Sequence, residues 1–256
     1  MTEEDFTPFT LDGKRIVITG ASSGIGQQCA ISCSRMNARV VLIGRNADRL
    51  AETLGRMKGE GHMSVSLDLT DYDRIPAIVK SIVDSVGKID GLIHCAGIST
   101  TLPLNLVTNE KLVEFMSTNV LSAINLSREL FKRKYSNDGG SIIFMASVMG
   151  VVGERGKMLY GLTKGALISG ARSLACELSK RNIRVNCISP GAIQTPINEK
   201  LPHMADPELR AQLEDKHLLG LGKTTDIANG CIYLLSDAAR WITGQNLIID
   251  GGYTAQ

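Results

Sequence analysis

Short apolar runs alternate with longer amphipathic segments along nearly the whole chain. The runs are rich in valine and isoleucine, as buried strands are, while the segments between them carry apolar residues at helical spacing. The predicted strands are 14–19, 39–43, 63–67, 91–94, 141–145, 183–188 and 247–249. The predicted helices are 26–36, 48–58, 71–86, 109–134, 159–180 and 225–236. This alternation favours an α/β fold built on one doubly wound parallel sheet of about seven strands, with helices on both faces.

Two segments depart from this alternation. Residues 1–10 are expected to form a flexible tail, and the loose stretch ends in a Leu-Asp-Gly turn at Gly13. Residues 196–218 contain three prolines, so we expect an excursion from the core that covers the substrate as a lid. The sequence contains no repeat, low-complexity tract or linker, which predicts a single domain over residues 1–256.

Composition narrows the classes of function. The 256 residues carry a net charge of +2, which gives no reason to expect a polyanionic partner. Aromatic residues make up 4% of the chain, too few for a nucleic-acid stacking surface. No apolar run approaches the roughly 20 residues of a membrane span, and the acidic start is unlike a signal peptide. We therefore expect a cytoplasmic protein without nucleic-acid or membrane partners.

The six cysteines and four histidines show no ligand pattern. Cys29 and Cys33 are the only cysteines close in sequence, and no histidine stands beside them at ligand spacing. Disulfides are rare in a reducing cytosol. The cysteines are therefore interpreted as small buried thiols, and no metal site is predicted.

A glycine-rich turn joins the first predicted strand to the first helix. In such a turn the first glycine permits a tight bend, the second lets the backbone approach a phosphate, and the third lets the helix pack near the strand. The N-terminus of the helix adds amide donors and a partial positive charge for a pyrophosphate. The alternative is a packing turn without a ligand. The predicted binding residues are Gly20, Ser22, Ser23, Gly24, Ile25 and Gly26.

The end of the second strand bears on which dinucleotide binds. Proteins that bind NAD usually place a carboxylate there for the ribose hydroxyls, but this chain has Gly44-Arg45-Asn46. Arg45 can accept a 2′-phosphate, so NADP(H) is favoured and NAD(H) remains possible. An ordinary solvated arginine is the alternative. Asp68, followed by Leu69, is expected either to accept from the adenine amino group or to cap a helix.

The fourth strand ends in His94-Cys95-Ala96-Gly97. The small residues Cys95, Ala96 and Gly97 would let a ribose pass over the backbone. His94 is interpreted as a packing residue at the strand end rather than as a catalyst.

A serine and a tyrosine–lysine pair follow the fifth strand. Tyr160 and Lys164 are one helical turn apart and share a helix face, while Ser147 stands just after the strand. A lysine ammonium beside a phenol favours the phenolate, so Tyr160 is expected to act as an acid or base nearer neutral pH. Taken alone, the pair also fits an exposed helix face.

Together these residues resemble the short-chain dehydrogenase/reductase family. The resemblance spans about residues 11–253 and is closest to the 3-oxoacyl-[acyl-carrier-protein] reductases and related ketone reductases. It rests on residues 19–26, Ala96-Gly97, Asn119, Ser147, Tyr160-x-x-x-Lys164, Pro190-Gly191 and the closing segment 244–252. His94-Cys95 departs from the Asn-Asn that the family commonly carries. The resemblance implies a Rossmann fold and a homotetramer formed partly through helix 159–180.

The resemblance also implies a role for each residue. Tyr160 would exchange a proton with the substrate oxygen, which Ser147 would hold. Lys164 would lower the pKa of the tyrosine and bind the nicotinamide ribose, and Asn119 would hold a water of a proton relay. The residues expected around the nicotinamide are Pro190, Gly191, Ile193 and Thr195.

The substrate class stays broad at this point. The predicted activity is hydride transfer between the nicotinamide of NADP(H) and a carbonyl or secondary alcohol, with 3-oxoacyl thioesters among the candidates. The pocket should be lined by residues 148–158 and 196–218. The basic residues 132–134 would suit an acidic carrier protein, or form a solvated helix end. The alternative function is non-catalytic dinucleotide binding or redox sensing on the same fold.

Overall fold

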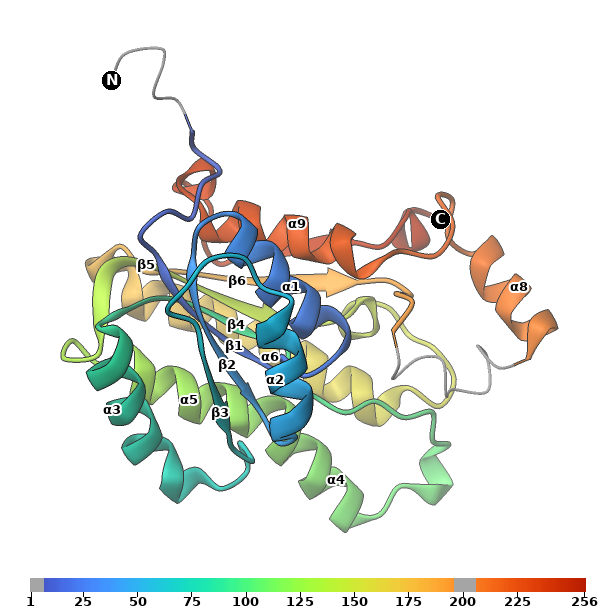
Figure 1. Ribbon diagram of the computed structural model, residues 1–256. Coiled ribbons are helices and arrows are strands. Elements are labelled where there is room, and N and C mark those ends of the chain that lie inside the picture. Colours follow the sequence, from blue (N-terminus) through green and yellow to red (C-terminus); the bar gives the residue numbers. More distant parts are fainter. Residues whose placement is uncertain (1–6, 196–205) are drawn as a thin grey trace.

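The computed structural model describes residues 7–195 and 206–256. Within these residues seven strands form one parallel sheet in the order β3-β2-β1-β4-β5-β6-β7. The sheet confirms the predicted doubly wound α/β fold (Figure 1). The strands are β1 Arg15–Thr19, β2 Arg39–Gly44, β3 Met63–Ser66, β4 Ile89–His94, β5 Ser136–Met145, β6 Arg184–Pro190 and β7 Asn246–Ile249.

Helices cover both faces of the sheet. The main helices are α1 Gly24–Arg35, α2 Ala47–Gly55, α3 Ile75–Val86, α4 Asn109–Met116, α5 Ser122–Leu130, α6 Met158–Leu178, α8 Pro207–Asp215 and α9 Thr224–Leu235. Helices α1, α2 and α9 pack on one face, while α3, α5 and α6 pack on the other (Figure 1). Successive residues of a strand point to opposite faces, so Val17 of β1 joins one core while Ile16 and Ile18 join the other.

The strand order reverses between β1 and β4. From β1 the sheet continues to β2 and β3, whereas β4 is followed by β5, β6 and β7 on the other side. The loops that leave the carboxyl ends of β1 and β4 therefore diverge, and a crevice opens between them. In open parallel sheets this is where ligands bind.

The predicted helix 109–134 is wrong in one respect, because the structure interrupts it. A π-helical turn, Ser117–Leu121, separates α4 from α5, and α5 ends at Leu130. Such turns shift the register of a helix by one residue and often occur at functional sites. The turn contains Asn119, whose side chain is fully buried.

Other boundaries also differ from the prediction. β5 begins at Ser136 rather than at residue 141, because Ser136 pairs with Ile89 across a register shift. A 3₁₀ turn, Tyr72–Arg74, precedes α3, whose proline lies in the first helical turn, where proline is tolerated.

The expected loose tail is wrong for the described residues 7–13, while residues 1–6 lie outside the described range. Leu11 is fully buried, and its amide donates to the Met36 carbonyl (3.0 Å). The Pro8 carbonyl accepts from Ala238 (3.0 Å). This segment is therefore held against the α1–α9 layer.

All six cysteines are free. Cys29, Cys33, Cys187 and Cys231 are buried as predicted, whereas Cys95 is half-buried and Cys176 is exposed. Among the described residues, none of the helices has the length and apolarity that crossing a membrane requires.

Candidate active site

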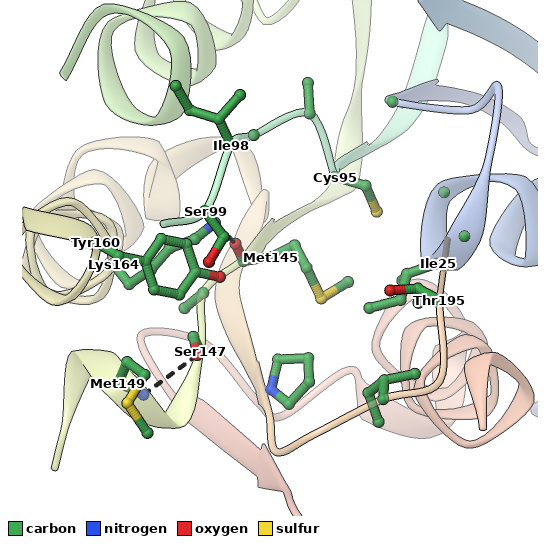
Figure 2. Close-up of a pocket in the computed structure, with 18 of the residues that line it drawn as sticks. Ile25, Cys95, Ile98, Ser99, Met145, Ser147, Met149, Tyr160, Lys164 and Thr195 are labelled. Atoms are coloured by element: carbon green, nitrogen blue, oxygen red, sulfur yellow. Dashed lines mark hydrogen bonds between the residues drawn. The ribbon is translucent and has the colours of Figure 1, made fainter. Parts of the chain in front are cut away.

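A cleft of about 900 Å³ opens at the carboxyl ends of β1, β4, β5 and β6. Nearly every residue that the sequence nominates lines it, although those residues are spread from Gly20 to Thr195. Among the individually predicted site residues the two exceptions are Asn46 and Asn119, and of the predicted pocket segment 148–158 only Val148, Met149, Glu154 and Lys157 line the cleft. Figure 2 shows Tyr160, Ser147 and Ser99 grouped at one end of the cleft, with Cys95, Ile25 and Thr195 across from them.

The glycine turn forms one wall of the cleft and leaves no room for a side chain at Gly20 or Gly26. Gly20 has φ of +63°, and a Cβ there would lie 2.9 Å from the Ala96 nitrogen. A Cβ at Gly26 would collide with the Gly20 carbonyl oxygen. Helix α1 begins at Gly24 and carries no acidic residue in its first turn. This cradle therefore fits the pyrophosphate of a dinucleotide, which needs close backbone approach and a helix N-terminus.

Arg45 and Asp68 lie together at the far end of the cleft. The Arg45 guanidinium is 3.9 Å from the Asp68 carboxylate, and both side chains are largely exposed. Asp68 also accepts from the amide (3.0 Å) and the hydroxyl (2.8 Å) of Thr70. These two bonds, with a smaller contribution from Arg45, hold the pKa of Asp68 below its usual range. The carboxylate thus stabilises the turn after β3, but it does not cap a helix, because Asp71 is the N-cap of the 3₁₀ turn that follows.

Asn46 is the N-cap of α2 and does not line the cleft. Its side-chain oxygen accepts from the Arg49 amide (2.9 Å). Asparagine is a preferred N-cap because it satisfies an otherwise unpaired helix amide. The structure therefore assigns Asn46 a local structural contact, and its predicted contact with the cofactor is not supported.

His94 ties together three parts of the molecule beneath the cleft. Its Nδ1 lies 3.1 Å from the Thr19 hydroxyl of β1, and its Nε2 lies 3.2 Å from the Ser122 hydroxyl of α5. The Thr19 hydroxyl also accepts from the Ala96 amide (3.1 Å). Burial, and then the charge of Lys164, lowers the pKa of His94 to about 3, so the imidazole is neutral. As predicted, His94 is a packing residue.

Asn119 positions the loop after β4 rather than lining the cleft. Its side chain accepts from the Ile98 amide (2.8 Å) and donates to the Ile98 carbonyl (2.9 Å). It also donates to the Thr163 hydroxyl (3.0 Å) in α6. The π turn thereby joins the loop wall to the helix that carries Tyr160.

The serine, tyrosine and lysine converge at one end of the cleft. The Ser147 hydroxyl accepts from the Met149 amide (3.2 Å), and the Tyr160 side chain points into the cleft beside it (Figure 2). Lys164 is buried, and its ammonium donates to the Met145 carbonyl (2.7 Å). That ammonium lies 5.4 Å from the centre of the Tyr160 ring. The three side chains therefore share one small region, as their spacing predicts.

The pKa shifts of this group differ from the sequence-based expectation. Burial raises the pKa of Tyr160 to about 12, and a hydrogen bond with Ser147 opposes part of this shift. Burial also lowers the pKa of Lys164 to about 8, and electrostatic interactions with Cys95 and Cys187 oppose part of this shift. The expected lowering of the Tyr160 pKa is therefore not seen in this structure, where desolvation raises it. Tyr160 stays protonated at neutral pH and can act as an acid.

His217 lines the cleft, and the sequence pattern did not nominate it. Its Nε2 accepts from the Ala192 amide (3.0 Å), so Nδ1 carries the proton and donates to the Leu213 carbonyl of α8 (2.8 Å). The ring is buried and lies 4.9 Å from the Tyr253 ring. The only feature of the sequence that pointed to His217 is its position in the proline-rich segment 196–218. His217 thus fixes α8 to the segment that follows β6.

The predicted lid is described only in part. Residues 196–205 lie outside the described residues. Helix α8 belongs to the remainder, and its Leu209, Gln212 and Leu213 line the cleft.

Comparison with known proteins agrees with this geometry. A family model described as Enoyl-(Acyl carrier protein) reductase, of the short-chain alcohol dehydrogenase type, matches residues 20–254. A 3-oxoacyl-[acyl-carrier-protein] reductase of Thermotoga maritima is 33% identical over 245 residues, which is 94% of this chain and 98% of the relative. An L-rhamnose 1-dehydrogenase (NAD(P)(+)) of Azotobacter vinelandii is 33% identical over 248 residues, with coverages of 93% and 96%.

A solved structure shows the same fold. It is a candidate NAD(P)-dependent gluconate 5-dehydrogenase of Beutenbergia cavernae with bound NADP. Its TM-score is 0.88 at 30% identity, over 98% of this chain and all of that one.

Proposed function

Since the chain belongs to the short-chain dehydrogenase/reductase family, we propose that it is an NADP(H)-dependent enzyme that interconverts a carbonyl and a secondary alcohol. One observation carries the proposal. Ser147, Tyr160 and Lys164 share a cleft with a glycine cradle suited to a pyrophosphate. Proteins of this family bind nicotinamide dinucleotides, and the similar proteins are dehydrogenases and reductases.

The bound nicotinamide would supply or accept the hydride. The residues of this chain handle the oxygen and the proton. The Ser147 hydroxyl would donate to the carbonyl oxygen and orient it, while Tyr160 delivers a proton to the charge that develops there. A phenol with a pKa of about 12 keeps its proton until that charge appears.

Lys164 and Asn119 would support this transfer. Lys164 would bind the nicotinamide ribose and place a positive charge near the phenolate that remains. Its pKa of about 8 lets it exchange protons with solvent near neutral pH. Asn119 fixes Ile98 beside this site, and we propose that the π turn around it holds the water of the relay.

Arg45 supports the preference for NADP(H). Its guanidinium is exposed after β2, and the residues Gly44-Arg45-Asn46 carry no carboxylate of their own. A 2′-phosphate would pair with Arg45 through charge-assisted hydrogen bonds. Asp68 already attracts the guanidinium, and we propose that Arg45 keeps this weak exposed contact while it binds the phosphate.

The substrate, the assembly and the location are proposed more broadly. A 3-oxoacyl thioester is one candidate, because a 3-oxoacyl reductase is among the similar proteins, although another of them acts on a sugar. We propose a homotetramer because α4, the π turn, α5 and α6 expose Val113, Leu121, Ile124 and Leu162. A cytoplasmic location is consistent with six free thiols.

The decisive experiment measures cofactor oxidation against a panel of ketones, oxo acids, sugars and acyl thioesters. We expect turnover with at least one class, and a higher kcat/KM for NADPH than for NADH. If no carbonyl compound supports oxidation of either cofactor, the chain is a dinucleotide-binding or redox-sensing protein instead.

A further inference from the structure

Lys157 lines the same cleft as Tyr160 and Lys164, and the reaction proposed above does not use it. It directly precedes α6 and stands three residues before Tyr160. Side chains three apart at a helix start lie on one side, with Cβ atoms about 5–6 Å apart. The Lys157 ammonium bonds to Thr100 and Thr101, which directly follow Ser99, and Ser99 lies beside Tyr160 in the cleft (Figure 2).

The contacts of this ammonium direct it across the cleft. It donates to the Thr101 hydroxyl (2.7 Å) and is 3.4 Å from the Thr100 carbonyl. Both belong to the loop after β4, whose Leu102 amide also donates to the Gly156 carbonyl (2.8 Å). These hydrogen bonds join the loop after β4 to the segment before α6, and Lys157 lies between the two.

Lys157 has no ionic partner in the described part of the chain. None of the ion pairs there includes it. Desolvation lowers its pKa, and attraction from Glu154 opposes the shift only in part. A half-buried cation whose hydrogen-bond acceptors are both neutral retains attraction for an anion. The N-terminal end of α6 adds a partial positive charge of the same sign.

We propose that Lys157 binds a carboxylate carried by the substrate, so that the enzyme acts on oxo acids and the corresponding hydroxy acids. The inference rests on the proposed function and names the substrate class for the same site. The carboxylate does not change during the reaction. It orients the carbonyl, which is a few bonds away in the same substrate, toward Ser147 and Tyr160. A thioester offers no negative charge at that position, so the proposal favours free acids over acyl thioesters.

The test compares a short straight-chain 3-oxo acid with its methyl ester in the wild type and in Lys157→Met. Methionine keeps the length of the side chain and removes the charge. We expect Lys157→Met to lower kcat/KM for the acid by about 10- to 100-fold, which is typical for loss of a charged hydrogen bond. For the ester we expect a change below about threefold, which also shows that the variant is folded.

Lys216→Met is the matched control. Lys216 lines the same cleft, but its side chain is exposed. Its replacement makes the same change in net charge and should alter kcat/KM for the acid by less than about threefold. An equal loss in the two variants would mean that the general field of the cleft, and not a site at Lys157, attracts the acid.

Inhibition supplies a readout that does not require the natural substrate. Butanoate should compete with a neutral ketone in the wild type and lose this effect in Lys157→Met. Equal kcat/KM for acid and ester in the wild type, together with equal inhibition of both proteins, would overturn the inference while the proposed function stands. Absence of cofactor oxidation with every carbonyl compound would overturn the proposed function, and the inference with it.

Discussion

The two ends of the cleft are held in place by different parts of the chain. At the catalytic end, buried side chains bond to main-chain atoms, as Lys164 does to Met145 and Asn119 does to Ile98. At the other end, which we propose binds the adenosine (the adenosine end), glycine backbone forms the cradle, and the side chains of Arg45 and Asp68 are exposed. A substitution at the first end removes a reacting or buried group, while one at the second end changes an exposed contact. Their effects should differ by orders of magnitude.

The largest effect is expected from Tyr160→Phe, which removes only the phenolic hydroxyl. Turnover should fall by about 1,000-fold or more, because proton transfer by a positioned group contributes up to about four orders of magnitude. The dissociation constant of NADPH should change by less than about threefold, since the glycine cradle is untouched. Steady-state kinetics and a fluorescence titration measure the two quantities.

Tyr253→Phe provides the control for this change. Tyr253 lines the same cleft and also loses a hydroxyl, but we assign it no proton-transfer role, so turnover should stay within about threefold. Ketone reduction by Tyr160→Phe at a rate close to the wild type would contradict the assignment of the acid.

A smaller loss with a distinct pH dependence is expected from Lys164→Met. Lysine is charged below its pKa, which is about 8 here, and only the charged form stabilises the phenolate that forms during reduction. In the wild type, kcat/KM for reduction should therefore fall as the pH rises through about 8. The variant should be about 100-fold slower and should lack this decline. If kcat/KM for reduction still declines near pH 8 in Lys164→Met, a group other than Lys164 causes the decline.

The sequence predicts the cleft well because local patterns determine its walls. Strand runs and glycine spacing indicate the sheet and its cradle, and the separation of Tyr160 from Lys164 indicates a shared helix face. The carboxyl ends of parallel strands then bring these residues to one edge. For that reason nearly all of the nominated residues line one cleft.

Features that depend on tertiary contacts are not visible in those patterns. The π turn at Asn119 has no periodic signature, and the sequence therefore predicts one continuous helix there. Burial sets the pKa of Tyr160, and the ammonium of Lys164 is bonded to Met145 of β5, a contact between residues of different elements. His217 meets Ala192 only because α8 folds back over the segment after β6.

A moderate effect is expected at the adenosine end from Arg45→Gln. Loss of one exposed charge-assisted contact should raise KM for NADPH about tenfold and change KM for NADH by less than about threefold. The ratio of the two kcat/KM values measures the change in preference. If both cofactors are affected equally, Arg45 is the solvated arginine that the sequence also allowed.

The smallest effect on activity is expected from His94→Asn, which separates stability from catalysis. Turnover should stay within about threefold, because His94 lies beneath the cleft and does not line it. The free energy of unfolding of the wild type and of His94→Asn should depend differently on pH. The folded protein holds the pKa of His94 at about 3, whereas an unfolded histidine titrates near about 6.5. The unfolded chain therefore binds a proton first as the pH falls.

The contribution of His94 is thus fully present above about pH 6.5 and is lost progressively as the pH falls toward about 3. Between pH 7 and pH 5, the free energy of unfolding should fall by about 2 kcal/mol more in the wild type than in His94→Asn. Urea unfolding at the two pH values measures this difference. Ser122→Ala keeps the buried imidazole and should retain the larger loss. Equal losses in the wild type and His94→Asn would mean that His94 binds a proton as readily in the folded protein as in the unfolded chain. The enclosure of the imidazole between Thr19 and Ser122 is the reason to expect otherwise.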